Sequence, residues 1–336
     1  MPTAPRTTRG AAFQVKWRMI KSARLRIVGR RLLQALPVVI LSTFIVFGLL
    51  KLVPGDVAVT LAGDNASDQR IAEIREIYGL NQPFLVQYGS WLLKALHGDL
   101  SKSLISNEAV LTAIQRCLPH TILIVVLALL TALIIGIPLG IAAATKPGSW
   151  IDGFVMAIAS LGVAVPNFWL GMLLVAFFSL QLNWLPATGA VSLMKDPWVA
   201  LSHAILPAVA LASGGIAEVA RQLRSSLVEI LSSQQVRTLH AKGLPPSSIL
   251  WRHGLKNVSV NLLTVVSLLA NRMLAATVVV EAVFAIPGMG GLIVNAAMNR
   301  DFPVVQGVVF TMVLIVVSIN LLTDILYSVL DPRISS

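Results

Sequence analysis

The sequence predicts an all-α, polytopic membrane protein with six transmembrane helices. Of its 336 residues, 56% are hydrophobic and only 12% are charged, and the mean hydropathy is +0.81. A soluble domain of this size carries about 25% charged residues, so much of the surface must face lipid. The apolar residues occur in blocks of about 20, the length that a helix needs to cross a hydrocarbon core roughly 30 Å thick. Such blocks exclude a transmembrane β-barrel, whose strands alternate over about 10 residues.

Six apolar blocks are expected to cross the membrane, at residues 32–53, 118–144, 154–180, 203–220, 258–284 and 304–330. The fourth block is the weakest, because Pro207 and two adjacent glycines interrupt it. Without this block, however, the basic segment 221–257 would fall outside the cell. Basic flanks are held on the cytoplasmic side during insertion, so we retain the fourth span.

The positive charges predict that both termini lie in the cytoplasm. Residues 1–31 form a basic tail with nine Lys and Arg residues and no acid. When six spans are threaded from this tail, the inside segments hold 17 of the 26 Lys and Arg residues and the outside segments hold seven. This asymmetry is what the positive-inside rule requires. We expect the tail to bind anionic lipid headgroups, and we do not expect the protein to bind nucleic acid.

The segment 54–117 is expected to form an extracytoplasmic loop between the first two spans. It contains two helical patterns, Asp68–Tyr78 and Gln87–Leu96, and Gly79 is placed to end the first of them. Acidic residues outnumber basic ones in this loop. We predict a small folded cap outside the membrane or, as the alternative, an interfacial helical hairpin.

The cytoplasmic segment 221–257 predicts two short helices joined by a glycine turn. Ser232-Ser233 can start the first helix, and Gly243 can adopt the left-handed conformation that ends it. Pro245-Pro246, after Leu244, prevent continuation, and Ser247 is expected to cap the second helix. A stiff element of this kind on the membrane face is suited to receive force from a soluble partner.

One run in this segment resembles the cytoplasmic coupling motif of binding-protein-dependent ABC permeases, in the dipeptide, oligopeptide and nickel branch. The run consists of Val236, Arg237, Thr238, Leu239, His240, Ala241, Lys242, Gly243 and Leu244. The usual motif has tyrosine, alanine and arginine where this chain has Gln235, Leu239 and His240. Other short matches follow in the order of the family: Val53–Asp56, Tyr78–Pro83, Gly98–Leu100, Gly136–Gly140, Ile286–Gly290, Asp301–Gly307 and Asp331–Arg333.

The resemblance implies the type I ABC importer permease fold, with a core over 108–330 and no enzymatic activity. It implies that two homologous permease chains pair in the bacterial inner membrane, each resting its coupling helix on one of two ATPase subunits. A soluble substrate-binding protein is expected to dock outside. ATP and Mg²⁺ are expected on the ATPase subunits and no cofactor in this chain, which lacks the Gly-x-x-x-x-Gly-Lys-Ser/Thr phosphate loop.

The resemblance favours di- or oligopeptides as the substrate, with nickel, opines and glycosides as alternatives within the family. A secondary transporter driven by an ion gradient is the alternative from a different class. It would need midplane carboxylates and an inverted repeat, whereas the acids here lie mostly near the ends of the blocks. Metal binding is not expected, because His203 and His253 lack ligand-spaced partners and Cys117 is the only cysteine.

Four charged residues fall in or near the apolar blocks, namely Glu218, Arg272, Glu281 and Asp324. Charges at such positions usually face the interior of the bundle or a water-filled path. Arg272, Glu281, Pro287 and Gly288 are therefore candidates for the translocation path or its gate. A structural ion pair is the alternative for the charged residues, and Asp324 is expected to be structural.

Overall fold

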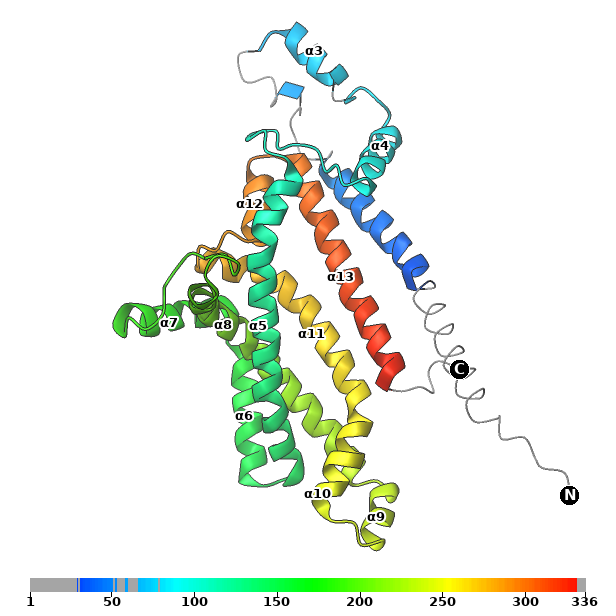
Figure 1. The fold of residues 1–336 in the computed structure, drawn as a ribbon, viewed down its shortest axis with the longest axis vertical. Coiled ribbons are helices and arrows are strands. Elements are labelled where there is room, and N and C mark those ends of the chain that lie inside the picture. Colours follow the sequence, from blue (N-terminus) through cyan, green and yellow to red (C-terminus); the bar gives the residue numbers. More distant parts are fainter. Residues whose placement is uncertain are drawn as a thin grey trace, which may run out of the picture.

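The computed structural model describes residues 29, 31–50, 52, 58, 59, 66–77 and 79–330. Most of the basic tail and the matches at Val53–Asp56 and Asp331–Arg333 lie outside the described residues. The described part of the chain consists mainly of helices (Figure 1). In chain order these are an N-terminal helix (Arg31–Leu50), α3 (Asp68–Ile77), α4 (Phe84–Leu96), α5 (Val110–Thr145), α6 (Trp150–Ala164), α7 (Asn167–Leu174), η1 (Val175–Gln181), α8 (Pro197–Leu231), α9 (Gln234–Ala241), α10 (Pro246–Ser248), η2 (Ile249–Gly254), α11 (Leu255–Val283), α12 (Met289–Met298) and α13 (Phe302–Leu330).

Five helices of the described part are long and apolar enough to cross a membrane. They are the N-terminal helix, α5, α8, the continuous stretch Pro246–Val283 that contains α11, and α13. The bent pair formed by α6 and α7–η1 makes a sixth span if it is counted as one. The predicted fold class, an all-α membrane protein with six transmembrane helices, is confirmed, and the bent pair is the sixth span.

The third expected span, 154–180, is bent, which corrects the expectation of one continuous helix. α6 ends at Ala164 and α7 begins at Asn167, and the two parts are bent by 97°. Pro166 lies in the break; it lacks a backbone N–H and disfavours helical geometry at Val165, which has φ −83° and ψ 122°. As a result, α7 points sideways out of the bundle (Figure 1).

The fourth expected span, 203–220, is the middle of a much longer helix. α8 has 35 residues and begins after Asp196, whose Oδ1 accepts hydrogen bonds from Trp198 N and Val199 N, both at 3.1 Å. Pro207 lies within the helix without ending it. Hydropathy underestimates the length of α8, because several charged residues occupy its last turns.

α8 lies against α5 at two glycines of α5. A Cβ atom on Gly136 would lie 2.9 Å from Val219 Cβ, and one on Gly140 would lie 2.8 Å from Ala220 O. Neither position has room for a side chain, so the four-residue glycine spacing allows the two helix backbones to approach closely. α8 also contacts α6, α7 and α11, whereas α13 packs on α11, α12 and α5.

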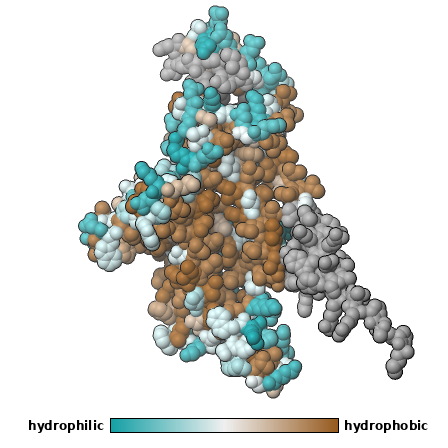
Figure 2. Space-filling model, viewed as in Figure 1, coloured by the Kyte–Doolittle hydropathy of each residue, from teal (hydrophilic) through white to brown (hydrophobic). Residues whose placement is uncertain are grey.

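The bundle has two ends that differ from its middle. α3 and α4 lie at one end and α9 lies at the other (Figure 1), and we call these the α4 end and the α9 end. Figure 2 shows a hydrophobic band over the middle of the molecule, with more polar residues toward both ends. Large apolar side chains such as Leu130, Ile134 and Leu268 are exposed on the spanning helices. This surface suits a helical bundle surrounded by lipid.

At the α4 end, the two expected helices are present as α3 and α4, and α4 connects the N-terminal helix to α13. Tyr88 Oη donates to Ile40 O at 3.0 Å and lies 2.9 Å from Thr43 Oγ1. The ring of Trp91 packs edge-on against Phe310 of α13, with 5.9 Å between the ring centroids. α4 is thus packed on the bundle through hydrogen bonds of Tyr88 and aromatic contacts.

Candidate functional site

Segment 221–257 lies at the α9 end, where the chain passes from α8 to α11. α9 begins after Ser233, whose side chain accepts a hydrogen bond from Val236 N at 3.4 Å. Gly243 follows the end of α9 with φ +76°, a left-handed conformation that glycine adopts without the steric penalty of a Cβ atom. The predicted helix start and glycine turn are therefore present at the predicted residues.

Two backbone hydrogen bonds close the end of α9. Gly243 N donates to His240 O at 2.9 Å, and Leu244 N donates to Leu239 O at 3.2 Å. This pair of bonds is the Schellman motif, which satisfies the last carbonyl groups of the helix and fixes the direction in which the chain leaves it.

Most of the run that resembles a coupling motif points away from the bundle. Val236 is only 3% exposed and anchors α9, while Leu239 and Leu244 are partly buried. The other members of the run are exposed, namely Arg237, Thr238, His240, Ala241, Lys242 and Gly243. The fold thus presents one short surface at the tip of the bundle, with a positive charge from its arginine and lysine.

The second helix of this segment differs from the expectation. It begins at Pro246, in the first-turn position that proline favours, so Ser247 lies inside it and does not cap it. α10, the π-helical η2 and α11 continue as one stretch, Pro246–Val283. Gly254 of η2 lies close to α8, since a Cβ atom there would be 3.3 Å from Leu227 Cδ2. The part of the segment after the glycine turn is therefore continuous with the spanning helix α11 and lies against α8.

An ion pair between Arg224, at the start of this segment, and the buried Asp152 escaped the sequence analysis. Arg224 Nε donates to Asp152 Oδ1 at 2.6 Å, and its Nη2 donates to Oδ2 at 2.5 Å. Gly148 N donates to the same Oδ2 at 2.9 Å. Bidentate arginine–carboxylate pairs are short, strong and directional, so this one holds the α5–α6 loop and the start of α6 against the last turns of α8.

Arg272 of α11 pairs with Glu218 of α8, through Arg272 Nη2 and Glu218 Oε1. The side chain of Arg272 is 60% exposed and that of Glu218 is 26% exposed, although both lie well inside spanning helices. Closer to the α9 end, Asn261 Nδ2 of α11 donates to Ser226 Oγ of α8 at 2.6 Å. The exposed face between α8 and α11 is therefore polar, and we call these four residues the polar face.

Glu281 lies apart from the polar face and is 1% exposed. Its Oε1 accepts from Thr121 Oγ1 of α5 at 2.6 Å, and its Oε2 accepts from Gly290 N at 2.8 Å and Gly291 N at 3.3 Å. The latter two groups belong to the first turn of α12, where unpaired N–H groups and the helix dipole favour a negative charge. Glu281 thus caps α12 from within α11.

The other candidate gate residues lie in this packed turn. A Cβ atom on Gly288 would lie 2.3 Å from Glu281 Cδ, so the glycine permits the cap, while Pro287 is exposed. The structure thus brings Glu281, Pro287 and Gly288 together and separates them from the ion pair of Arg272. Asp324 Oδ2 of α13 lies 3.1 Å from Arg31 Nε and joins α13 to the N-terminal helix.

Comparison with known proteins shows the family of this chain. Residues 136–336 match the model of the binding-protein-dependent transport system inner membrane component. This chain belongs to that family. Residues 24–125 also match the model of the N-terminal part of such membrane components. The chain is therefore a transport permease subunit of ABC importers, and ATP is hydrolysed by separate ATPase subunits.

Relatives of the permease align over nearly its whole length. A Brucella abortus (strain 2308) protein, named as a permease of a peptide transport system, is 41% identical over 305 residues, covering 91% of this chain and 97% of that protein. The dipeptide transport system permease protein DppB of Alkalihalophilus pseudofirmus is 38% identical over 326 residues, covering 91% and 98%. The glutathione transport system permease protein GsiC of Salmonella paratyphi A is 37% identical over 310 residues, covering 92% and 99%.

Solved structures agree on the fold of the permease. A chain of the MetNI methionine ABC transporter, in an inward-facing conformation, superposes with a TM-score of 0.54 at 17% identity. The match covers 65% of this chain and 96% of that chain. At this identity the likeness shows the type I ABC importer permease fold alone.

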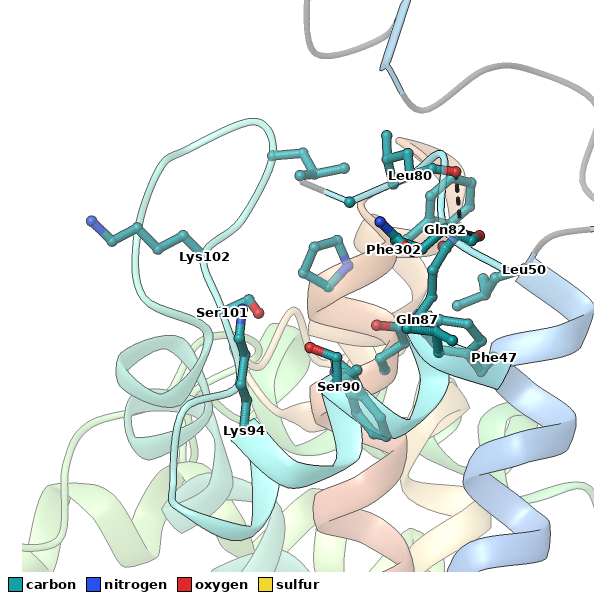
Figure 3. A pocket seen from close by; sticks show the side chains of 16 residues that line it. Phe47, Leu50, Leu80, Gln82, Gln87, Ser90, Lys94, Ser101, Lys102 and Phe302 are labelled. Carbon is teal, nitrogen blue, oxygen red and sulfur yellow. Dashed lines mark hydrogen bonds between the residues drawn. The ribbon is translucent and has the colours of Figure 1, made fainter. Parts of the chain in front are cut away.

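At the α4 end, the permease has a cavity of about 430 Å³. It lies between the N-terminal helix, α4, the loop before α5 and the start of α13 (Figure 3). Gln87 Nε2 donates to Leu80 O at 3.0 Å and to Gln82 O at 2.7 Å across one wall. Two lysines, Lys94 and Lys102, also line it. This end of the permease therefore offers a hollowed surface of mixed polarity that hydropathy alone did not indicate.

Proposed function

We propose that this permease imports di- or oligopeptides. The relatives that align over nearly the whole chain support this substrate class, since their names refer to peptide, dipeptide, oligopeptide and glutathione transport. The permease forms half of the translocation path, and a second homologous chain forms the other half. Two ATPase subunits and one soluble binding protein complete the importer. The basic segments set the orientation of the permease in the membrane, and both termini lie in the cytoplasm of the bacterial cell.

Segment 221–257 couples the permease to the ATPase. The observation that carries this proposal is the exposed, positively charged surface of α9 at the tip of the bundle, followed by a helix that continues without a break into α11. In this arrangement, a movement of the ATPase reaches the membrane through a stiff connection. The pair of Arg224 and Asp152 ties the start of this segment, at the end of α8, to the neighbouring α5–α6 loop.

The polar face lines the path. A charged side chain exposed in the middle of a span is costly in hydrocarbon and usually faces a water-filled cavity or another protein chain. Arg272 and Glu218 meet this description, whereas Glu281 is buried and held by hydrogen bonds in the turn before α12. We therefore assign Arg272, with Glu218 as its partner, to the translocation path. We assign a structural role to Glu281, Pro287 and Gly288, which form the turn between α11 and α12 that we call the latch.

The binding protein docks at the α4 end. This end lies opposite segment 221–257, so it faces the compartment from which substrate arrives (Figure 1). The loop before α5 is fixed there by Asp301 Oδ2, which accepts from Ser103 Oγ at 2.5 Å, and by Asp301 Oδ1, which accepts from Leu104 N at 3.1 Å. A surface fixed in this way can transmit docking of the receptor to α13.

Replacing Gly243 tests the coupling function. Gly243→Ala forces a Cβ atom into a left-handed conformation at the end of α9, and it should weaken copurification with the ATPase subunits and slow ATP-driven uptake of peptide. Gly98→Ala is the matched control. Gly98 has φ +85° and, like Gly243, no atom within 4 Å of the position that a Cβ atom would take, but it lies at the α4 end. Equal loss of ATPase binding in both variants would contradict the proposal.

Uptake by the intact importer separates the remaining alternatives. Competition by unlabelled dipeptides, but not by Ni²⁺, opines or glycosides, is expected for a peptide importer. An ion-gradient transporter would keep working after the ATPase subunits are deleted, and it would stop when the ion gradient is collapsed. Loss of uptake on deleting the ATPase genes, with the ion gradient intact, is the result that the proposal requires.

A further inference from the structure

The ion pair between Glu218 and Arg272 lies at the level where α8 and α11 are in close contact. A Cβ atom on Gly215, one turn before Glu218, would lie 2.8 Å from Met273 Cε, the neighbour of Arg272. The side chain of Met273 thus packs on the backbone of α8 beneath the pair, and the charged groups extend outward. The pair is therefore fixed in position by the helix contact, while its charged groups stay accessible.

The pair uses little of its hydrogen-bonding capacity. Within the described part of the chain, the bond between the two side chains joins a single guanidinium nitrogen to a single carboxylate oxygen. A guanidinium has five N–H donors and a carboxylate has about four acceptor sites. By contrast, the carboxylate of Glu281 is occupied on both oxygens and is sealed from solvent. The exposed pair can therefore take a ligand without first unfolding its surroundings.

A zwitterion matches this arrangement. Arginine binds a carboxylate in a planar, two-point geometry, and the carboxylate of Glu218 can accept from an ammonium group. Exposed ion pairs contribute little net stability, so a substrate with both charges can replace the internal contact at little cost. A neutral glycoside lacks both groups, and a cationic metal complex would attract Glu218 but repel Arg272, so neither satisfies both members of the pair.

Resting on the proposed function, we propose that Glu218 and Arg272 recognise the free amino and carboxyl ends of a peptide as it passes along the polar face. The internal ion pair closes when the path is empty and opens when a zwitterionic peptide occupies it. A weak, replaceable site of this kind lets the substrate bind and leave, as conduction requires. The pair would thus add a selection for free termini to the selection made by the binding protein.

The test uses the complete importer, reconstituted in proteoliposomes with its ATPase subunits and saturated binding protein. ATP-driven uptake is measured for dialanine and for dialanine amide, which lacks the carboxylate. In each case the binding protein is saturated with the compound. The wild type is expected to favour dialanine at least tenfold. Arg272→Gln should lower that preference to about equal rates by slowing dialanine alone, and Arg272→Lys should leave an intermediate preference, since lysine keeps the charge without the two-point geometry.

Two controls separate recognition from a structural role. Arg116→Gln breaks the pair of Arg116 and Glu108, whose side chains are 61% and 29% exposed, close to the values for Arg272 and Glu218. It should leave the preference unchanged. The double variant Glu218→Gln with Arg272→Gln would recover uptake if the pair were only structural, because it removes both charges, but it should stay slow if each end of the peptide needs its partner.

The inference is overturned if Arg272→Gln keeps the preference for dialanine, if the double variant recovers, or if the wild type transports both compounds equally. If the wild type takes up dialanine without such a preference, this inference is wrong and the proposal of peptide import still holds. If the wild type takes up neither compound, both this inference and the proposal of peptide import are wrong. If the Arg272→Gln variant fails to copurify with the ATPase subunits, the inference is tested with Arg272→Lys, by the same comparison of dialanine uptake with dialanine amide uptake.

Discussion

Thr121 and Glu281 meet inside the bundle although 160 positions separate them in the sequence, and the threonine hydroxyl donates to the carboxylate at 2.6 Å. The same hydroxyl oxygen accepts from Met289 N at 2.9 Å. Because the carboxylate also accepts from the first turn of α12, these three segments form one connected network. This one hydrogen-bond network therefore links α5, α11 and α12 near the end of α11.

Thr121→Val should destabilise the permease. The substitution removes the hydroxyl that serves both Glu281 and Met289 N, and it leaves a buried carboxylate oxygen and a buried N–H group without this partner. A lost hydrogen bond of this kind costs about 1–3 kcal/mol. The midpoint of thermal unfolding in detergent should fall accordingly. Thr145→Val is the control, because the hydroxyl of Thr145 is exposed and bonds only locally, to Ala142 O; an equal fall in both variants would contradict the network.

Glycines around the latch should differ sharply in their tolerance of alanine. A Cβ atom on Gly288 would lie 2.3 Å from the Glu281 carboxyl carbon, and one on Gly290 would lie 2.5 Å from Val278 Cα. Overpacking of this kind costs about 1–3 kcal/mol. Gly291 has no such contact within 3.7 Å. Folded yield after size-exclusion chromatography should therefore drop for Gly288→Ala and Gly290→Ala and stay near wild type for Gly291→Ala.

A similar comparison tests the packing of α8 against α5. Gly140→Ala would place a Cβ atom 2.8 Å from Ala220 O and should destabilise by about 1–3 kcal/mol. Gly153→Ala adds a Cβ atom within helix α6, where nothing lies within 4 Å, and should be neutral or stabilising by roughly 0.5–1 kcal/mol. Thermal unfolding measured on both variants decides the matter. Equal stability of Gly140→Ala and Gly153→Ala would show that the helices do not approach so closely.

The pair of Asp152 and Arg224 should matter for coupling. Asp152→Asn weakens the two charge-assisted hydrogen bonds that hold the α5–α6 loop near the last turns of α8, so ATP hydrolysis and uptake should become less tightly linked. The readout is the number of ATP molecules hydrolysed per peptide transported, which should rise. Asp68→Asn provides a control at the α4 end, and a ratio unchanged in both variants would contradict this role.

The sequence predicts the helical blocks well because each is long, apolar and flanked by charges. It also predicts the turn at Gly243, since glycine followed by two prolines leaves the chain few conformations. The bend at Pro166 and the continuity of Pro246–Val283 are different. A proline can interrupt a membrane helix or begin one, and only the packing of neighbouring helices decides which occurs.

The charged residues show why site prediction from sequence is harder. Glu281 and Arg272 lie nine positions apart in similar apolar surroundings, yet one is sealed in a turn and the other is exposed. Hydropathy cannot separate them, because burial depends on α12 and α5, which approach from elsewhere in the chain. The pair of Asp152 and Arg224 likewise bridges 72 positions, and no local pattern links its two members.

The position of Lys242 tests the central claim most directly. In a Cys117→Ala background, which removes the only native cysteine, Lys242→Cys places a thiol on the exposed end of α9. A short bifunctional crosslinker should join this residue to an ATPase subunit, and a membrane-impermeant maleimide should label it in inside-out vesicles but not in intact cells. Labelling from outside intact cells, without a crosslink to the ATPase, would contradict the account.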